Sequence, residues 1–304
     1  MTSSKCLTLT YLTHASYASL NGSDKEADNI SSIKKIKMND GLEYPYKSSQ
    51  AIRRDLREQL AVLGWALSEA ALAQDKNAKG AATTQGDPTK YIDDDLFGFM
   101  IAEKDTKKRA GPVRVSPLIS LEPYRGELDF ATNYMGVKAG GTPNIFETEI
   151  HSGFYRGTIL IELDRVGVAD AENYKLDLAP GEKKRRVASL VDAIQNLWGV
   201  GRQSRFLADI SPKFVAAALM RVKNPIFMEC LCVKHTCDSD RTPERTGRVD
   251  LDLIENTRKD FEGVIDKCVL GERKGFFAED SEAAEPLGVA FDKIRGWLDE
   301  AYGG

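Results

Sequence analysis

The residues best suited to chemistry are three arginines near the start of a segment with helical periodicity. Arg53 and Arg57 are four residues apart, so they share one face of the expected helix, and Arg54 lies beside them. Guanidinium groups suit phosphate because their planar fork donates two hydrogen bonds. Ser48 or Ser49 can cap the start of the helix, where free backbone N–H groups would add to an anion site. The alternative is an exposed helix whose arginines pair with its own acidic residues.

A second group of donors follows another basic segment. Four consecutive cations at 183–186 begin a second expected helix, and the loop after that helix combines glycines with polar side chains. Its candidate ligands are Gly199, Gly201, Arg202, Ser204 and Arg205. The loop lacks the GxxxxGK[ST] pattern of a P-loop. An ordinary helix end followed by a loop is the alternative interpretation.

The excursion at 129–144 contains three glycines and a proline and is predicted to protrude as a loop or ribbon. It mixes polar, aromatic and bulky apolar side chains: Asn133, Tyr134, Met135 and Lys138. Such a ribbon could wedge between bases or stack against them. A surface hairpin without a ligand is the alternative.

Patterns for catalysis and metal binding are weak. The three histidines, His14, His151 and His235, lie in no HExxH motif and beside no nucleophile motif. Cys230, Cys232 and Cys237 near His235 could bind zinc, but the CxC spacing is not the usual CxxC, and buried cysteines pack well in an apolar strand. The acidic run at 93–95 could hold Mg²⁺, although such a run more often caps or flanks a strand. No catalytic residue, metal site or cofactor is predicted.

The elements that must position these residues follow an α+β order. Period-two patterns predict strands at 7–17, 33–38, 96–101, 113–121, 145–163, 214–222 and 226–233. Helical periodicity predicts helices at 49–67, 183–198, 251–268 and 286–302. This order is compatible with a ferredoxin-like antiparallel sheet that carries insertions. One such insertion is the polar, Gly- and Ala-rich segment 74–95, which is predicted to be mobile.

The composition is that of a globular protein outside membranes. The chain has 304 residues, 42% of them hydrophobic and 29% charged, and no apolar run long enough to span a bilayer. Its start lacks a secretory pattern, and five cysteines without a framework spacing suit a reducing compartment. A single domain with insertions over 1–304, located in the cytoplasm, is expected.

The net charge of −4 differs from the basic balance usual in nucleic-acid binders. The charges are segregated, however. Cations cluster at 34–37, 53–57, 107–109 and 183–186, whereas acids gather at 93–95 and towards the end of the chain. Such a chain could bind an anion on one face and pack acid against base between copies. Scattered, solvated charge is the alternative.

The segment SSQAIRR at 48–54 resembles the serine–glutamine–arginine segment of the DevR-type, type I-B CRISPR backbone subunits, in the repeat-associated RNA-binding superfamily. Four further pieces match in the same order: Asn21 after the first strand, Leu96-Phe97-Gly98, Arg114-Val115-Ser116-Pro117, and Gly199 to Arg205 leading into Asp209-Ile210-Ser211-Pro212. The resemblance covers nearly the whole chain and thins after about Val233.

This resemblance implies an RRM-like palm with an inserted helical region and a thumb-like β-hairpin, for which 129–144 is the candidate. Copies would stack head to tail along one guide crRNA, with other Cascade subunits, and hold its backbone while the guide pairs with target DNA. The implied RNA-binding residues are Asn21, Lys47, Ser48, Ser49, Gln50, Arg53, Arg54, Arg57, Gly199, Gly201, Arg202, Ser204 and Arg205. The thumb, with Asn133, Tyr134, Met135 and Lys138, would interrupt pairing at regular intervals, although 80–95 could instead contact RNA or the next copy.

Other functions remain open. Related type III subunits cut target RNA with an aspartate near the first strand, and Asp24, Asp28 and Asp40 lie in a comparable region. A guide-processing endoribonuclease and a DNA-binding transcriptional regulator are further alternatives, although no helix-turn-helix pattern supports the regulator. The match to a non-cutting branch favours a protein that is not an enzyme.

Overall fold

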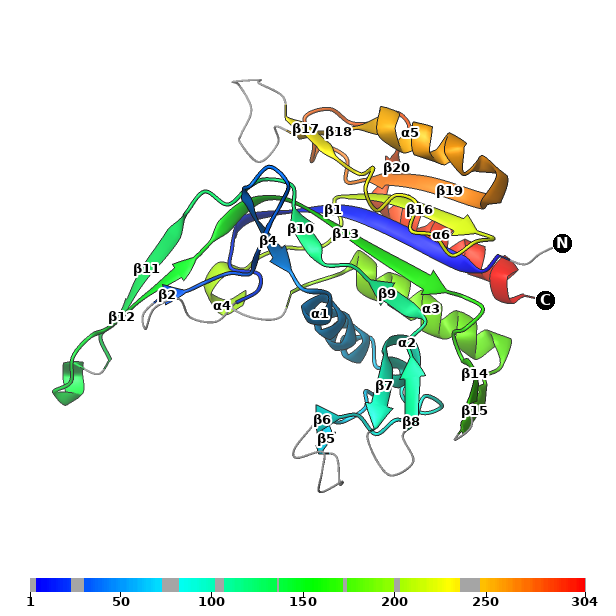
Figure 1. The fold of residues 1–304 in the computed structure, drawn as a ribbon, viewed down its shortest axis with the longest axis horizontal. Coiled ribbons are helices and arrows are strands. Elements are labelled where there is room, and N and C mark those ends of the chain that lie inside the picture. The colour runs from blue at the N-terminus through cyan, green and yellow to red at the C-terminus, as the bar shows by residue number, and fades with distance from the viewer. Residues whose placement is uncertain are drawn as a thin grey trace.

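The structure is a computed structural model of the chain, shown as a ribbon in Figure 1. It describes residues 4–22, 30–72, 82–101, 107–135, 137–171, 174–199, 203–235 and 247–303. The architecture is mixed α+β, as predicted: one large sheet is covered on both faces, and smaller ribbons project from it.

The large sheet is built around the long first strand, β1 (Cys6–Ala18). It lies between two antiparallel neighbours, β13 (His151–Glu162) and β16 (Phe214–Met220). The nine-stranded sheet has the order β20-β19-β16-β1-β13-β10-β4-β3, and β9 also pairs with β13. The remaining strands are β3 (Lys35–Lys37), β4 (Glu43–Lys47), β9 (Val113–Val115), β10 (Leu118–Ser120), β19 (Ile265–Glu272) and β20 (Glu285–Pro286).

Three helices cover one face of this sheet: α1 (Ser49–Val62), α3 (Pro180–Gln195) and α6 (Leu287–Tyr302). The apolar stripe predicted for α3 is buried throughout, as in Val187, Leu190 and Ile194. Gly271 of β19 lets α6 approach closely, because a Cβ there would lie 2.4 Å from the Cβ of Ala290. This face contains the larger apolar core.

A second apolar core lies on the opposite face of the sheet. It is covered by the turns at 226–230, by the ribbon of β17 (Val233–His235) and β18 (Gly247–Val249), and by α5 (Leu251–Asp260). The short helix η3 (Glu262–Val264) then leads from α5 into β19. Covering both faces explains why β1 is buried along most of its length.

The projections are short ribbons and helices. The longest is the hairpin of β11 (Leu128–Asn133) and β12 (Asn144–Glu149), with η1 (Val137–Ala139) at its tip and β2 (Ile30–Ser31) parallel to β12. The others are β5 (Ala71–Leu72) with β6 (Ala82–Thr83), α2 (Ile92–Phe97), β7 (Gly98–Ile101) with β8 (Lys107–Ala110), β14 (Val168–Ala171) with β15 (Tyr174–Asp177), and α4 (Gln203–Phe206).

Several predicted elements differ from the structure; the predicted strand 145–163, for example, forms two strands, β12 and β13, in different sheets. The predicted strand 226–233 is mostly turns, and the predicted strand 96–101 begins as the end of α2. The predicted helix 251–268 ends at Asp260, because the chain from Ile265 onward pairs with β16. Pairing with a buried strand overrides local periodicity here. Within the described part of the predicted mobile insertion, residues 91–95 are buried in the core. Residues 74–81 lie outside the described residues.

Candidate nucleic-acid interface

The start of α1 is fixed by two residues that the sequence singled out. The Ser48 Oγ accepts a hydrogen bond of 3.3 Å from the Ala51 N–H, which makes Ser48 the N-cap. The Ser48 N–H in turn donates to the Asn21 Oδ1 at 2.9 Å. Asn21 follows β1, so the central strand orients the helix start directly. Because the first turn contains no acidic residue, the helix dipole is left to be met by an anion.

Arg53 has the environment of an anion ligand. Its side chain is half-buried, and burial is the main cause that lowers its pKa, followed by the positive charges of Arg57 and Arg114. Its buried Nε has no hydrogen-bond acceptor among the described residues. A cation that is desolvated, repelled by two others and missing an acceptor is unfavourable unless an anion binds beside it.

Arg57 is held in place by the acidic helix α2. Its Nε lies 3.3 Å from the Asp93 Oδ2, and its guanidinium lies 4.8 Å from the centre of the Phe97 ring. Burial is the main cause that raises the pKa of Asp93, which also accepts the Ser68 N–H at 2.9 Å. The acidic run thus orients an arginine that remains 28% exposed.

Arg114 on β9 completes the group, although it is not among the residues predicted to bind RNA. It is flanked by the buried Val113 and Val115, so it faces away from their core, and its side chain is 54% exposed while its Nε lies 2.8 Å from Glu162. In the sequence, the alternation of apolar and basic residues in 113–115 already indicated that Arg114 lies on the face of the strand opposite to the two valines. Arg53, Arg57 and Arg114 are called the arginine cluster below.

Lys47 does not join this cluster. Its side chain is 2% exposed, and its Nζ lies 2.7 Å from Asp55, which is 1% exposed. This geometry gives no support to the prediction that the Lys47 side chain contacts RNA, because the last residue of β4 points into the core. Arg54 is 73% exposed and pairs with Glu58 at 3.2 Å, while Ser49 and Gln50 lie at the accessible start of α1.

The predicted glycine loop is only partly described. Gly201, Arg202 and the side chain of Ser204 lie outside the described residues, and Gly199 is buried. Arg205 pairs with Asp129, donates to the Thr148 Oγ1 at 3.0 Å and lies 4.8 Å from the Phe146 ring centre. This arginine therefore anchors α4 to the β11–β12 hairpin, and its predicted contact with RNA stays a prediction.

The hairpin tip carries the predicted thumb residues on its surface. Tyr134 is 64% exposed and Met135 is 81% exposed, and Lys138 is also exposed. The Asn133 Oδ1 accepts the Met135 N–H at 2.9 Å, which shapes the turn before them. Exposed aromatic and thioether groups on a projecting ribbon suit contacts with bases.

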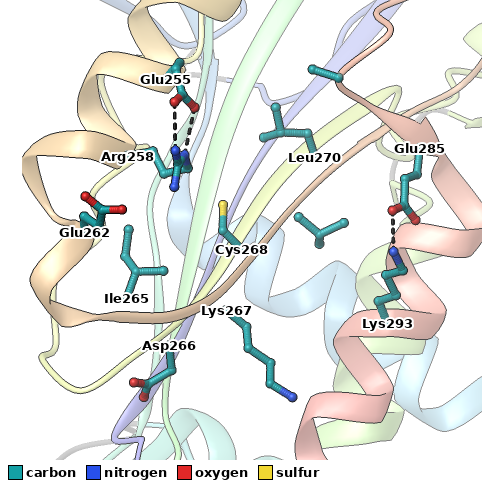
Figure 2. A pocket seen from close by; sticks show the side chains of 12 residues that line it. Glu255, Arg258, Glu262, Ile265, Asp266, Lys267, Cys268, Leu270, Glu285 and Lys293 are labelled. Atoms are coloured by element: carbon teal, nitrogen blue, oxygen red, sulfur yellow. Dashed lines mark hydrogen bonds and ion pairs between the residues drawn. The ribbon is translucent and has the colours of Figure 1, made fainter.

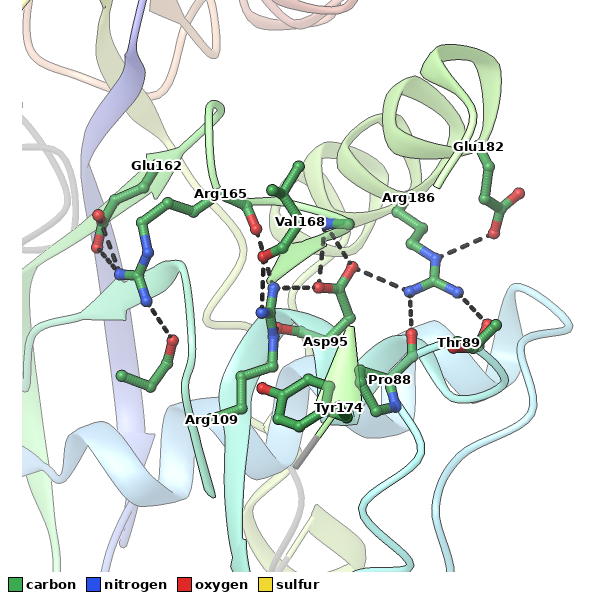
Figure 3. A network of polar contacts seen from close by, with 12 residues as sticks. Pro88, Thr89, Asp95, Arg109, Glu162, Arg165, Val168, Tyr174, Glu182 and Arg186 are labelled. Atoms are coloured by element: carbon green, nitrogen blue, oxygen red, sulfur yellow. Dashed lines mark hydrogen bonds and ion pairs between the residues drawn. The ribbon is translucent and has the colours of Figure 1, made fainter. Parts of the chain in front are cut away.

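Asp95, the last residue of the acidic run, belongs to a buried structural network (Figure 3). The Asp95 carboxylate contacts the Arg109 Nη2 at 2.5 Å and the Arg186 Nη1 at 2.9 Å. Both guanidiniums also donate to backbone carbonyls, from Arg186 to Pro88 and from Arg109 to Val168. Arg186 is 1% exposed, so it is a core residue and not part of a basic surface at 183–186.

The described residues contain no group of three acidic, histidine or cysteine side chains that could hold a metal ion. Cys237 lies outside them, as do Asp24 and Asp28. Among them there is also no helix with the length and apolar character needed to cross a bilayer.

Comparison with known proteins decides the family. The profile of the CRISPR-associated negative auto-regulator DevR/Csa2 family matches residues 10–240. The chain belongs to the DevR/Csa2 family. A curated relative from Myxococcus xanthus (strain DK1622), the CRISPR-associated protein Cas7/Cst2/DevR, is 28% identical over 278 residues, which cover 84% of this chain and 83% of the relative.

Solved structures share the fold of this DevR/Csa2-family chain. A chain of a CRISPR RNA-guided surveillance complex aligns with a TM-score of 0.59 and 19% identity, covering 96% of this chain and 99% of its own. A chain of a surveillance complex in a pre-nicking state aligns with a TM-score of 0.66 and 15% identity, covering 98% and 100%. The α+β fold is therefore that of surveillance-complex subunits, while the RRM-like description of its palm remains a prediction.

A cluster of titratable groups lies at the base of the hairpin in this family member. The Ser120 Oγ lies 3.0 Å from the His151 Nε2, and the Glu122 Oε2 accepts the Phe154 N–H at 2.8 Å. Burial raises the pKa of Glu122 to about 7 and lowers that of His151 to about 4. Both groups are therefore favoured in their neutral forms in the folded chain.

This cluster predicts a pH dependence that Glu122→Gln should expose. The stability contributed by the protonated Glu122 is full below the ordinary pKa of 4.5 and is lost as the pH rises to about 7. The free energy of unfolding of Glu122→Gln, relative to that of the wild type, should therefore rise by about 1–2 kcal/mol between pH 5 and pH 8. This magnitude allows for solvent screening. Urea unfolding at both pH values measures this. A difference in stability between variant and wild type that is the same at pH 5 and pH 8 would contradict this prediction. So would an equal rise in the exposed control Glu127→Gln.

Proposed function

We propose that this chain is a crRNA-binding backbone subunit of a type I CRISPR surveillance complex, with copies placed head to tail along the guide beside other subunits. The observation that carries the proposal is Arg53, a half-buried guanidinium that feels the charges of two other arginines and whose Nε has no acceptor among the described residues. Membership of the DevR/Csa2 family and the fold shared with chains of RNA-guided surveillance complexes support it.

The arginine cluster would hold the guide by its phosphates. Arg53, Arg57 and Arg114 each present a guanidinium, and the start of α1 adds backbone N–H groups. Phosphate contacts fix the position of a strand without reading its sequence. A subunit that serves every guide needs this property, because sequence is read by pairing between the guide and target DNA.

The β11–β12 hairpin would act as the thumb. Its exposed Tyr134 and Met135 could displace a base from the stack and so interrupt guide–target pairing. With 2-aminopurine placed along the target strand, the complex should give a periodic rise in fluorescence at unstacked positions. Tyr134→Ser with Met135→Ser should abolish the rise while guide affinity stays within about twofold. A rise unchanged in this variant would remove the tip from the thumb role.

We further propose that the chain does not cut RNA. Asp40 is the candidate aspartate within the described residues, and both its oxygens already have partners: the Tyr44 hydroxyl donates to Oδ2 at 2.6 Å and the Leu42 N–H to Oδ1 at 2.9 Å. These hydrogen bonds lower the pKa of Asp40, so it is a poor general base.

The proposal of no cleavage is tested by incubating labelled guide and target RNA with the pure protein and Mg²⁺. No product above the protein-free control is expected. Efficient cleavage that is lost in Asp28→Ala or Asp40→Ala, with RNA binding retained, would show that the chain is an endoribonuclease.

A further inference from the structure

The two ends of the nine-stranded sheet are both open edges. At one end, β19 pairs with β16 along its length, but on its outer side β20 pairs only with Gly271 and Glu272. Among the described residues, no strand covers the outer side of 265–270. An uncovered strand edge presents backbone donors and acceptors that can pair with another strand.

A groove follows this open edge of β19 (Figure 2). It has a volume of about 530 Å³ and lies between α5 on one side and α6 on the other. All six consecutive residues of 265–270 line it. Because successive side chains of a strand point to opposite faces, a groove that contacts all of them must run along the strand's edge.

The groove carries excess negative charge. Its cations are already paired, Arg258 with Glu255, Lys267 with Glu300 and Lys293 with Glu285. Glu262, which also lines it, has no ion pair with any described residue. Apolar side chains such as Ile265 and Leu270 lie along the same edge. The matching occupant is an extended segment with basic and apolar side chains.

An extended segment with basic and apolar side chains lies at the opposite end of the same sheet. The edge strand β3 pairs only with β4 among the described residues. Lys34 and Lys37 have no ion pair within the described part of the chain, whereas Lys35 is bound to Glu149. Ile36 is 43% exposed and Met38 is 37% exposed, so apolar side chains accompany the free cations. This basic segment takes no part in the arginine cluster.

We propose that β3 of one copy adds to the open edge of β19 of the next copy. The two edges are complementary in backbone pairing, charge and apolar content, and they lie at opposite ends of one sheet. Such a contact joins different surfaces, so it repeats from copy to copy and extends the assembly in one direction. The inference rests on the proposed stacking of copies along the guide and supplies the contact between them.

Disulfide trapping tests this contact in the full chain bound to a guide-length RNA. Ile36→Cys, Lys37→Cys and Met38→Cys sample both faces of the β3 segment, each in a background with Cys232→Ser and Cys237→Ser. Oxidation with copper phenanthroline should link at least one of these positions to the native Cys268, which lines the groove. Because each copy carries both partners, the expected product is a ladder of linked dimers and larger multimers. Peptide mass spectrometry identifies the bond.

Two controls define the result. Cys268→Ser should abolish the ladder, and Val62→Cys, at a position that is 79% exposed on α1, should not form one. Absence of a link to Cys268 in all three variants, while light scattering shows copies assembling on RNA, would overturn the β3–β19 contact and leave the proposed function intact. Failure of the wild-type chain to assemble on RNA would instead overturn the proposed function, and this contact with it.

Discussion

Arg53→Gln combined with Arg57→Gln should weaken binding of guide-length RNA by about a hundredfold or more without unfolding the chain. Charge-assisted hydrogen bonds contribute roughly 1.5–3 kcal/mol each, so losing two accounts for this effect. Fluorescence anisotropy at several salt concentrations gives the affinity and its salt dependence. If each arginine neutralises one phosphate, the slope of log K against log salt should become shallower by about 0.7 per arginine.

The melting temperature of the variants distinguishes the loss of an RNA contact from partial unfolding of the chain. Burial and neighbouring cations lower the pKa of Arg53, so its charge is unfavourable in the free protein, and Arg53→Gln alone should leave the melting temperature unchanged or raise it. The matched control, Lys175→Gln with Arg248→Gln, removes two positive charges at exposed positions outside the arginine cluster and should leave the fold intact. Equal loss of RNA affinity in both double variants would mean that overall charge, and not the arginine cluster, binds RNA.

Asp95→Ala should lower the free energy of unfolding by about 3–5 kcal/mol, the usual cost of leaving buried charges without their partner. Asp95 is fully buried and joins Arg109 and Arg186, which are 3% and 1% exposed. For a chain of this size the melting temperature should fall by about 5–8 °C. Urea unfolding followed by circular dichroism measures the effect.

The control for this network is Asp170→Ala. Asp170 pairs with Lys175 at 3.7 Å, but both side chains are more than four-fifths exposed, so its loss should cost less than about 0.5 kcal/mol. A small effect of Asp95→Ala would mean that Arg109 and Arg186 do not depend on it. Increased stability of Asp95→Ala would argue that the network trades stability for another role.

Local patterns predicted the parts of the fold whose packing matches their periodicity. The stripe of α3 and the cap at Ser48 follow from short-range chemistry, and both agree with the structure. The segment from Ile265 appeared helical because its apolar residues also fit a helical spacing. Only its pairing with β16, about fifty residues away in sequence, makes it a strand. Such long-range pairing is not visible in a local window.

The candidate site was predictable in part for the same reason. The helical spacing places Arg53 and Arg57 on one face, but spacing does not show that Lys47 is buried against Asp55. Nor does it show that Arg114, more than fifty residues further along the chain, lies near enough to Arg53 to lower its pKa. The acidic run was ambiguous for a similar reason, because the arginines that neutralise Asp95 come from β8 and α3.

The central claim is that copies of this chain assemble along a guide. Size-exclusion chromatography with light scattering, using single-stranded RNAs of increasing length, tests it most directly. We expect a ribonucleoprotein whose mass rises in equal steps of one chain as the RNA is lengthened, and Arg53→Gln with Arg57→Gln should not form it. If the chain stays monomeric and does not bind RNA of any length, it is not a backbone subunit that assembles along a guide.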